Sequence, residues 1–364
     1  MTYDPFPRGP ATVGVRTISV RDETRGGRTL EVELWHPAAE SHRGQDLLPE
    51  TQDRFEAVPG MPASVQRAVR DVEPAPGLFP LLVFMHGAYA HRRQSTALCT
   101  HLASHGYLVA APDFTGNTAA DQMQVMRPDV GATPRLTTMA QSAADRPLDV
   151  KFVIDRVLDG AAPGLSELVD GERIGTLGQS FGGWTCVALN SKDIRPKACF
   201  PIVPPWGRGA DGTGLLSSLA SLDDWARDVP TFILAAERDA MVKLDDVREL
   251  YRDLKVSKRL AILREAGHVH FADGPEAIHE ELRASFASND YPVGDGPAFD
   301  FPAMAAAMRP FSELCPASHG EAVAQGLCLA HMDTHLKHRP EASAFLNGDL
   351  VGELAARGID LDVR

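Results

Sequence analysis

Cysteine and long apolar runs are both scarce in this chain of 364 residues. Its five cysteines form no C-x-x-C pair and no dense framework, which argues against a cysteine metal site and a disulfide-stabilised scaffold. A bridge between Cys315 and Cys328 is conceivable, although buried reduced thiols are the simpler interpretation. No stretch approaches the roughly 18 consecutive apolar residues of a membrane helix, so we expect no integral membrane segment.

Positive charge is scarce as well. The formal net charge is −13, and Arg92-Arg93 is a pair rather than a basic stripe. An acidic chain repels phosphate backbones, so we expect no nucleic-acid partner. Residues 1–7 also lack the basic and apolar regions of a signal peptide, which favours a soluble cytoplasmic protein, or a secreted one if a leader has been trimmed.

What the chain does have is a globular composition, with 44% hydrophobic and 23% charged residues. Apolar and β-branched runs predict eight strands, and the first two read as a hairpin. The strands are expected at residues 15–21, 29–35, 79–85, 107–111, 174–177, 198–203, 231–236 and 259–263. Helices are expected at residues 94–104, 147–158, 184–189, 244–254 and 320–336, and a tail that carries residues 342–346 and 351–357 finishes the chain.

This alternation predicts an α/β fold with a mostly parallel sheet of about eight strands between layers of helices. Three segments without a steady period interrupt it, at about residues 37–78, 204–228 and 273–316. The chain has no internal repeat and no convincing linker. We therefore expect one domain over residues 1–364, with these segments as insertions.

A G-x-S-x-G pattern at residues 178–182 is the centre of the predicted chemistry. An apolar stretch precedes it and a helical stretch follows it, which is the strand–turn–helix setting of a nucleophile elbow. Gly178 and Gly182 would let neighbouring backbone pass close to a strained serine. Ser180 would then project from the turn as a nucleophile. The Phe181 amide would lie at a helix N-terminus, where anions are stabilised.

Acyl transfer by serine also needs a base and a carboxylate that orients the base. Asp239 and His268 each follow a predicted strand after the elbow. Functional groups of such sheets gather beyond the carboxyl ends of the strands. Ser180, Asp239 and His268, in this order, match the catalytic triad of α/β-hydrolases, so they are the candidate catalytic residues.

Other residues compete for these roles. His270 follows the same strand as the candidate base, and Asp113 follows a strand that precedes the elbow. Asp245 and Asp246 lie at a predicted helix start, where capping is the simpler role. These alternatives are weaker than the ordered triad but remain open.

The oxyanion hole and the pocket depend on turns whose register is open. Phe181 would give one oxyanion amide, and the turn after residue 85 should give the other, from Ala88 or alternatively Tyr89. Tyr89, Trp184 and Trp206 are candidate pocket residues, although both tryptophans could equally pack in the core. Residues 204–228 should emerge on the same rim as Ser180.

Metal and cofactor motifs are absent from the sequence. His101 and His105 lie four residues apart, as do His331 and His335, but neither pair has the glutamate of H-E-x-x-H. Histidine near a helix C-terminus is also favoured by the helix dipole. No dinucleotide fingerprint accompanies the glycines before the elbow, so we expect no metal and no cofactor.

Several motifs together resemble the dienelactone-hydrolase and platelet-activating-factor acetylhydrolase-like branch of the α/β-hydrolases. The resemblance covers nearly the whole chain. It is carried by residues 3–10, 13–17, His86-Gly87, 102–107, 111–113, 116–118, 145–150 and 178–183. Two departures stand out: Gln179 occupies a position where this branch often has histidine, and the nucleophile is Ser180 rather than the cysteine of true dienelactone hydrolases.

The resemblance implies that Ser180, Asp239 and His268 are the triad, with Ala88 and Phe181 as oxyanion donors. It predicts a cofactor-independent carboxylic-ester hydrolase that acts on short- to medium-chain, lipid-like or polyester substrates through an acyl-enzyme. An acyltransferase using the same acyl-enzyme and a non-catalytic binding module are the alternatives. The oligomeric state is left open.

Overall fold

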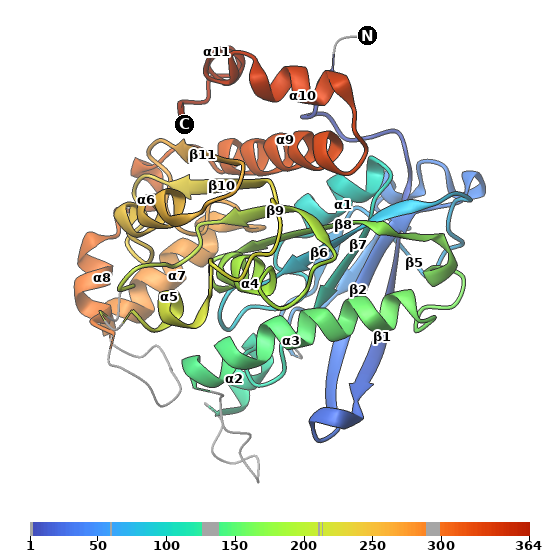
Figure 1. Cartoon of the computed structure of the whole chain (residues 1–364), viewed down its shortest axis with the longest axis horizontal. Coiled ribbons are helices and arrows are strands. Elements are labelled where there is room, and N and C mark those ends of the chain that lie inside the picture. Colours follow the sequence, from blue (N-terminus) through green and yellow to red (C-terminus); the bar gives the residue numbers. More distant parts are fainter. Residues whose placement is uncertain (1–2, 59, 126–137, 210–211, 213, 289–298) are drawn as a thin grey trace.

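Ten strands form one mixed sheet in the computed structural model, which describes residues 3–58, 60–125, 138–209, 212, 214–288 and 299–364 (Figure 1). The strand order is β12-β11-β10-β9-β8-β6-β7-β2-β1-β5. All neighbours from β11 to β7 in this order are parallel. These central strands are β6 (Phe79–Met85), β7 (Leu108–Pro112), β8 (Val169–Gln179), β9 (Pro196–Ile202), β10 (Thr231–Ala236) and β11 (Lys258–Leu263).

The central strands are buried on both faces, as their continuous apolar runs predict. Every residue of β6 after Phe79 is buried, and so is every residue of β7 and β10. Because the strands run parallel, the segments that leave their carboxyl ends meet at one edge of the sheet. The α/β architecture expected from the sequence is therefore confirmed.

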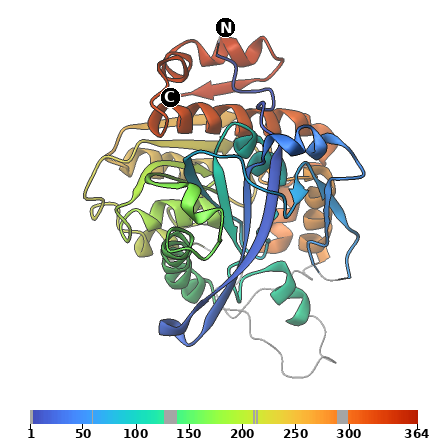
Figure 2. The same ribbon diagram turned by 90° about the vertical axis from the view of Figure 1, so that its right-hand side faces the viewer.

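The first two strands form the predicted antiparallel hairpin, β1 (Val13–Asp22) with β2 (Arg28–Pro37). Its turn lies on the opposite side of the molecule from the two chain ends (Figure 2). Two further strands, β5 (Val69–Arg70) and β12 (Leu361–Val363), occupy the two edges of the sheet. The sequence did not predict them because a strand of two or three residues is too short to show a period. They bring the sheet to ten strands rather than about eight.

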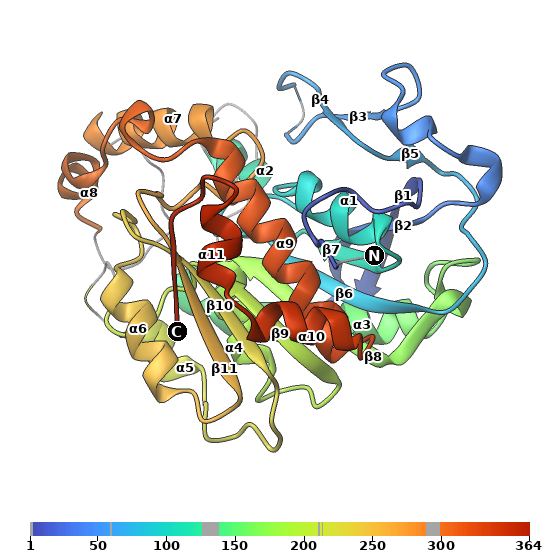
Figure 3. The same cartoon turned by 90° about the horizontal axis from the view of Figure 1, so that it is seen from above.

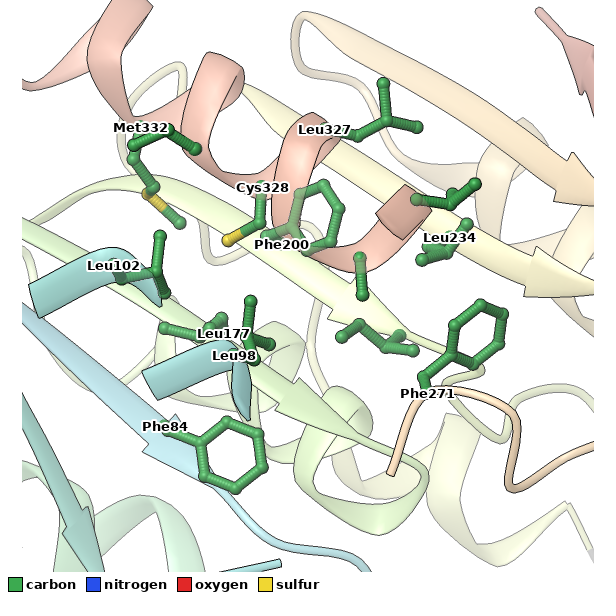
Figure 4. Packing of buried hydrophobic residues seen from close by; sticks show 14 of the residues in the cluster. Phe84, Leu98, Leu102, Leu177, Phe200, Leu234, Phe271, Leu327, Cys328 and Met332 are labelled. Atoms are coloured by element: carbon green, nitrogen blue, oxygen red, sulfur yellow. The ribbon is translucent and has the colours of Figure 1, made fainter. Parts of the chain in front are cut away.

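Helices cover both faces of the sheet. Helices α1 (Thr96–Ser104) and α9 (Ala317–His335) pack on one face, where Leu102, Phe200 and Met332 share a core (Figure 4). Helix α9 crosses the sheet, with α10 (Pro340–Asn347) and α11 (Leu350–Ala355) beside it (Figure 3). The other face is covered by α3 (Met139–Leu158), α4 (Phe181–Leu189) and α6 (Leu244–Asp253).

Helix α3 begins eight residues before its predicted start at Pro147. Proline inside a helix costs a hydrogen bond and about 3 kcal/mol. The preceding turns nevertheless stay helical because Ser142, Ala143 and Arg146 are buried there, and the Thr138 hydroxyl accepts from the Gln141 amide. The tertiary packing of these buried residues therefore outweighs the preference of proline for the first turn of a helix.

The insertions contain regular elements that their sequences did not predict. The first holds a two-stranded sheet, β3 (Asp53–Phe55) with β4 (Ser64–Gln66). The second holds α5 (Leu215–Leu219), and the third holds α7 (Pro275–Ser288) and α8 (Phe301–Ala307), which lie side by side (Figure 3). Helix α2 (Ala119–Val125) follows β7. Short 3-10 turns occupy Glu23–Arg25, Glu40–His42, Gln45–Leu47, Ser166–Leu168 and Phe311–Glu313.

Candidate active site

Ser180 stands on a strained turn between β8 and α4. Its backbone has φ 56° and ψ −122°, a conformation that side-chain-bearing residues rarely adopt. The Ser180 N–H donates to Ile202 O on β9 at 2.8 Å, and its carbonyl accepts from Trp184 N inside α4 at 3.0 Å. The turn is therefore held from both sides while the serine side chain projects from it, as a nucleophile elbow requires.

The two glycines of the pattern are needed for close packing. A Cβ on Gly182 would collide with Met85 O, the last residue of β6. A Cβ on Gly178 would lie 2.7 Å from both Met85 O and Gly182 O. Both distances are shorter than real Cβ contacts, so only glycine lets β6, β8 and α4 approach this closely.

Asp239 and His268 form a hydrogen-bonded pair beyond β10 and β11. His268 Nδ1 lies 2.6 Å from Asp239 Oδ2, and both side chains are buried. The other carboxylate oxygen accepts from the amides of Met241 and Val242 at 2.8 and 2.7 Å. Because the Asp239 carboxylate accepts hydrogen bonds, it fixes a proton on Nδ1 and leaves Nε2 of His268 with a lone pair.

Ser180 and His268 line the same cavity. Within the described residues the Ser180 hydroxyl makes no hydrogen bond, so it is free to turn toward the imidazole or toward a bound substrate. Catalytic hydrogen bonds commonly tighten only when substrate is bound. The structure thus brings together the three residues that the chain order had grouped.

Two amides beside Ser180 point to an anion site. Phe181 N is the first amide of α4, and neither it nor Ala88 N has a hydrogen-bond acceptor among the described residues. Ala88 lies in the turn after β6, where Tyr89 has φ 54°. Amides at a helix N-terminus and in such a turn are suited to stabilise a developing oxyanion.

Arg146 lies beneath this turn and was not singled out in the sequence. Its guanidinium donates to His86 O at 2.8 Å and to Gly87 O at 3.0 Å, and it has no exposed surface. The rings of Phe114 and Phe181 lie 4.2 and 4.4 Å from its central carbon. Burial lowers the pKa of Arg146 to about 9. Among the described residues this buried cation has no directly bonded carboxylate, and it ties the turn to the elbow.

His86 completes the support of the turn. It lies 2.7 Å from Gly87 O through Nδ1, and Nε2 accepts from the Phe114 amide at 3.2 Å, which fixes the tautomer. Complete burial, followed by the nearby Arg146 charge, lowers the pKa of His86 well below its ordinary value. The ring is therefore neutral and structural rather than a second base.

The cavity at Ser180 has a volume of about 280 Å³. Apolar side chains from three of the unpredicted helices and the segment after β9 form much of its wall. Those contributed by α5, α7 and α8 and their flanks are Leu215, Leu216, Ile278, Leu282, Phe286, Phe299, Phe301 and Met304. Its charged lining is limited to Arg208 and the titratable His268 among the described residues.

Two of the three predicted pocket residues line this cavity. Tyr89 and Trp206 do, and Trp206 is also packed in the core with an exposed fraction of 4%. Trp184 does not line the cavity. Its ring stacks on Phe181 at 5.3 Å, and its Nε1 donates to Leu216 O at 2.9 Å. Of the two roles that the sequence left open for Trp184, the structure shows core packing, with the ring behind the Phe181 amide rather than in the cavity wall.

The competing residues have other partners. His270 accepts from Gly267 N at 2.9 Å, contacts Cys315 O at 3.1 Å and stacks on Phe311. Asp113 pairs with Arg92, whose amide also donates to it at 2.6 Å. Neither residue is part of the cavity wall at Ser180. Asp245 and Asp246 lie in the first turn of α6, where the helix dipole favours acidic side chains, but the N-cap is Lys243 and makes no side-chain capping bond.

Three of the four histidines in the two predicted pairs contact backbone carbonyls. His101 and His105 contact Pro5 O and Pro7 O, and His331 contacts Pro230 O, at 3.0 to 3.1 Å. The described part of the chain holds no cluster of three or more histidine, cysteine or acidic residues placed to bind a metal. All five cysteines are free, so Cys315 and Cys328 form no bridge.

Membrane insertion has no support in the helices. Across the described ranges, none of them combines the length and the apolar character that a bilayer crossing requires.

Comparisons with known proteins bear on the family and the fold. Residues 26–135 match the family model of platelet-activating factor acetylhydrolase, isoform II. The chain is 26% identical over 230 residues to platelet-activating factor acetylhydrolase of Canis lupus familiaris, across 54% of this chain and 48% of that one. It is 28% identical over 142 residues to chlorophyllase type 0 of Chenopodium album, across 37% of each. The chain thus spans at most about half the length of these relatives.

A solved structure gives the wider match. A ferulic acid esterase from Streptomyces cinnamoneus aligns with a TM-score of 0.60 and 23% identity, over 92% of this chain and 93% of that one. At this identity the likeness establishes the fold. The chain has the α/β-hydrolase fold and, as its motifs predict, resembles the platelet-activating factor acetylhydrolase branch of that fold.

Proposed function

We propose that this protein is a serine carboxylic-ester hydrolase with Ser180, His268 and Asp239 as its catalytic triad. One observation carries the proposal: a serine on a strained elbow shares a cavity with a histidine whose Nδ1 is held by a buried carboxylate. The relatives' names, an acetylhydrolase and a chlorophyllase, support an ester substrate. We assign the function to a single domain, because all three residues follow strands of the ten-stranded sheet.

The reaction follows from the positions of these groups. Ser180 Oγ attacks the ester carbonyl carbon while His268 Nε2 takes the hydroxyl proton, and Asp239 stabilises the resulting imidazolium. The amides of Ala88 and Phe181 stabilise the oxyanion of the tetrahedral intermediate. The intermediate collapses, the C–O bond to the alcohol breaks, and His268 gives its proton to the leaving alkoxide. Water then attacks the acyl-enzyme by the same steps and releases the acid.

The cavity indicates the class of ester. Its walls are mostly apolar, and its volume of about 280 Å³ suits a short to medium acyl chain rather than a large polar group. Burial of each additional methylene contributes about 0.8 kcal/mol, so an apolar acyl chain gains affinity with length until the cavity is full. We therefore assign short- to medium-chain, lipid-like or polyester esters as substrates.

A panel of p-nitrophenyl esters of increasing acyl length tests this function. We expect turnover with a maximum at short to medium chains and no turnover by Ser180→Ala at equal protein concentration. Added alcohols should leave the acid as the main product. A wild-type protein that hydrolyses none of the esters would overturn the proposal, and a predominance of transesterified product would make it an acyltransferase instead.

A further inference from the structure

Two side-chain amides join the oxyanion turn to the loop of His268. Gly87 N donates to Gln94 Oε1 at 2.7 Å, and Gln94 Nε2 donates to Gln179 Oε1 at 3.0 Å. Gln179 Nε2 in turn donates to His268 O at 3.2 Å. The chain of three hydrogen bonds therefore begins one residue before Ala88 and ends on the candidate base itself.

The ends of this chain fix its direction. The Gly87 amide can only donate and the His268 carbonyl can only accept, so each glutamine must turn its oxygen toward Gly87 and its nitrogen toward His268. Both glutamines line the cavity beside Ser180, and Gln179 is buried with an exposed fraction of 1%. A carboxylate in either position would lack the donor that the next acceptor needs.

A backbone contact reinforces the same connection. Asp273 N donates to Gln94 O at 3.1 Å, and the Asp273 carboxylate accepts from the amides of Thr96 and Ala97 at the start of α1. The segment after His268 is thus tied to the segment that carries Gln94. Because Gln179 immediately precedes Ser180, the two amides connect nucleophile, base and oxyanion turn in one network.

We propose that Gln94 and Gln179 are positioning residues that hold the oxyanion turn and the His268 loop at the spacing required by the transition state. This inference rests on the proposed function. Neither amide needs to contact the reacting atoms, and neither titrates, so the spacing is independent of pH. Loss of the link should lower kcat, because misplacement of donors and base affects the transition state more than the bound substrate.

The isosteric variants Gln94→Glu and Gln179→Glu remove one donor each without changing shape. We expect kcat to fall roughly 10- to 100-fold, less than the roughly 10²- to 10³-fold loss when an oxyanion donor is removed, with KM changed by less than about threefold. Gln52→Glu is the matched control, because Gln52 Nε2 also donates to a backbone carbonyl, Asp46 O at 2.9 Å, away from the cavity. It should retain the wild-type kcat.

The pH profile separates positioning from a general structural role. A protonated glutamate can donate to His268 O, whereas the ionised form cannot. The ratio of Gln179→Glu to wild-type kcat should therefore rise as pH falls from 8 to 5. The double variant Gln94→Leu/Gln179→Leu should be no slower than the slower single leucine variant, because either change already breaks the link.

Hydrogen exchange reports on the link without any turnover. In Gln94→Glu and Gln179→Glu, peptides containing residues 86–90 and 267–272 should both exchange faster than in wild type and Gln52→Glu. A wild type without esterase activity would contradict the proposed function while leaving this readout intact. Unchanged exchange in both peptides, or wild-type kcat in both glutamate variants, would overturn the positioning role.

Discussion

The two sides of the cavity are built from different interactions. The floor consists of the elbow, the turn at residues 87–89 and the side chains of Gln94, Gln179 and His268. Directional hydrogen bonds hold it together, and Arg146 supports it from behind. The roof consists of the apolar side chains from α5, α7 and α8, which pack as hydrophobic clusters. Hydrogen bonds fix geometry to within tenths of an ångström, whereas apolar burial depends mainly on area.

This difference assigns different tasks to the two sides. Chemistry at an ester carbonyl needs donors and a base at defined positions, which the floor supplies. Selection of an acyl chain needs a wall of suitable size, which the roof supplies. Floor substitutions should therefore change kcat, and roof substitutions should change KM and chain-length preference.

The largest effect should come from the base on the floor. His268→Ala removes the only proton acceptor assigned to Ser180, so kcat should fall by roughly 10⁴ to 10⁶. The measurement is steady-state hydrolysis of a p-nitrophenyl ester, with circular dichroism to verify the fold. His270→Ala is the control, and greater loss there than in His268→Ala would mean that the wrong histidine has been assigned.

The second largest loss of kcat should come from Asp239, the carboxylate that orients His268. Asp239→Asn keeps the shape but no longer holds the proton on His268 Nδ1, and kcat should fall on the order of 10⁴. Asp113→Asn serves as the comparison, since that carboxylate pairs with Arg92 instead. An active Asp239→Asn beside an inactive Asp113→Asn would reverse the assignment.

Arg146→Lys tests whether Arg146 supports the floor, and the expected loss of kcat is intermediate in size. A lysine carries one compact charged group, so it cannot reach both carbonyls of the turn and lie between two rings. We expect kcat to fall about 10- to 100-fold, less than or equal to the loss of an oxyanion donor, with KM nearly constant. Arg195→Lys, in an ion pair with Asp193, should match wild type. Equal kcat in both variants would exclude a role for Arg146.

Substitutions in the roof should raise KM. Leu282 on α7 is half-buried and lines the cavity, so Leu282→Ala enlarges it at little cost in stability. We expect KM for medium-chain esters to rise roughly 5- to 50-fold, with kcat within about twofold and the preferred chain length increased. Leu219→Ala on α5, outside the cavity wall, is the control. An unchanged ester profile would show that α7 is only structural.

The smallest effect on activity should come from Asp273, whose substitution should change stability instead. Its carboxylate caps the start of α1, and the residue lies two positions before α7. Burial raises its pKa from 3.8 to about 6 despite the hydrogen bonds from Thr96 and Ala97. Between pH 4 and 6 the folded protein therefore binds more protons at this site than the unfolded chain, so its contribution to stability falls as pH rises. Asp273→Asn keeps an acceptor and does not titrate.

Urea unfolding of wild type and Asp273→Asn at several pH values measures this effect. The stability of the variant relative to wild type should increase by up to about 3 kcal/mol from pH 4 to pH 7. If the free energy of unfolding changed equally with pH in both proteins across that range, the assignment of this carboxyl pKa would be contradicted.

Much of the fold could be predicted because its signals are local. The buried strands read as continuous apolar runs, and the elbow reads as a glycine pattern between a strand and a helix. The supporting network could not be predicted in the same way. Arg146 and its acceptor His86 are 60 residues apart, and Gln94 and Gln179 are 85 apart, so each appears in the sequence as a single polar residue.

The roof could be predicted from the sequence only in part. Ile278, Leu282 and Phe286 recur every four residues after Gly274-Pro275, a pattern that indicates an amphipathic helix and could have predicted α7. That this helix lines the cavity depends on tertiary packing, which no local pattern contains. Trp184 illustrates the same limit, because the sequence allowed both a pocket position and core packing for it, and only the structure shows that it packs behind the elbow.

Reaction with a fluorophosphonate, followed by mass spectrometry of the intact protein and its peptides, tests directly whether Ser180 is an activated nucleophile. We expect one adduct per chain, located on Ser180, formed rapidly by wild type and very slowly by His268→Ala. Absence of an adduct on wild type, or an equally rapid adduct on Ser180→Ala, would contradict the claim that this elbow serine is an activated nucleophile.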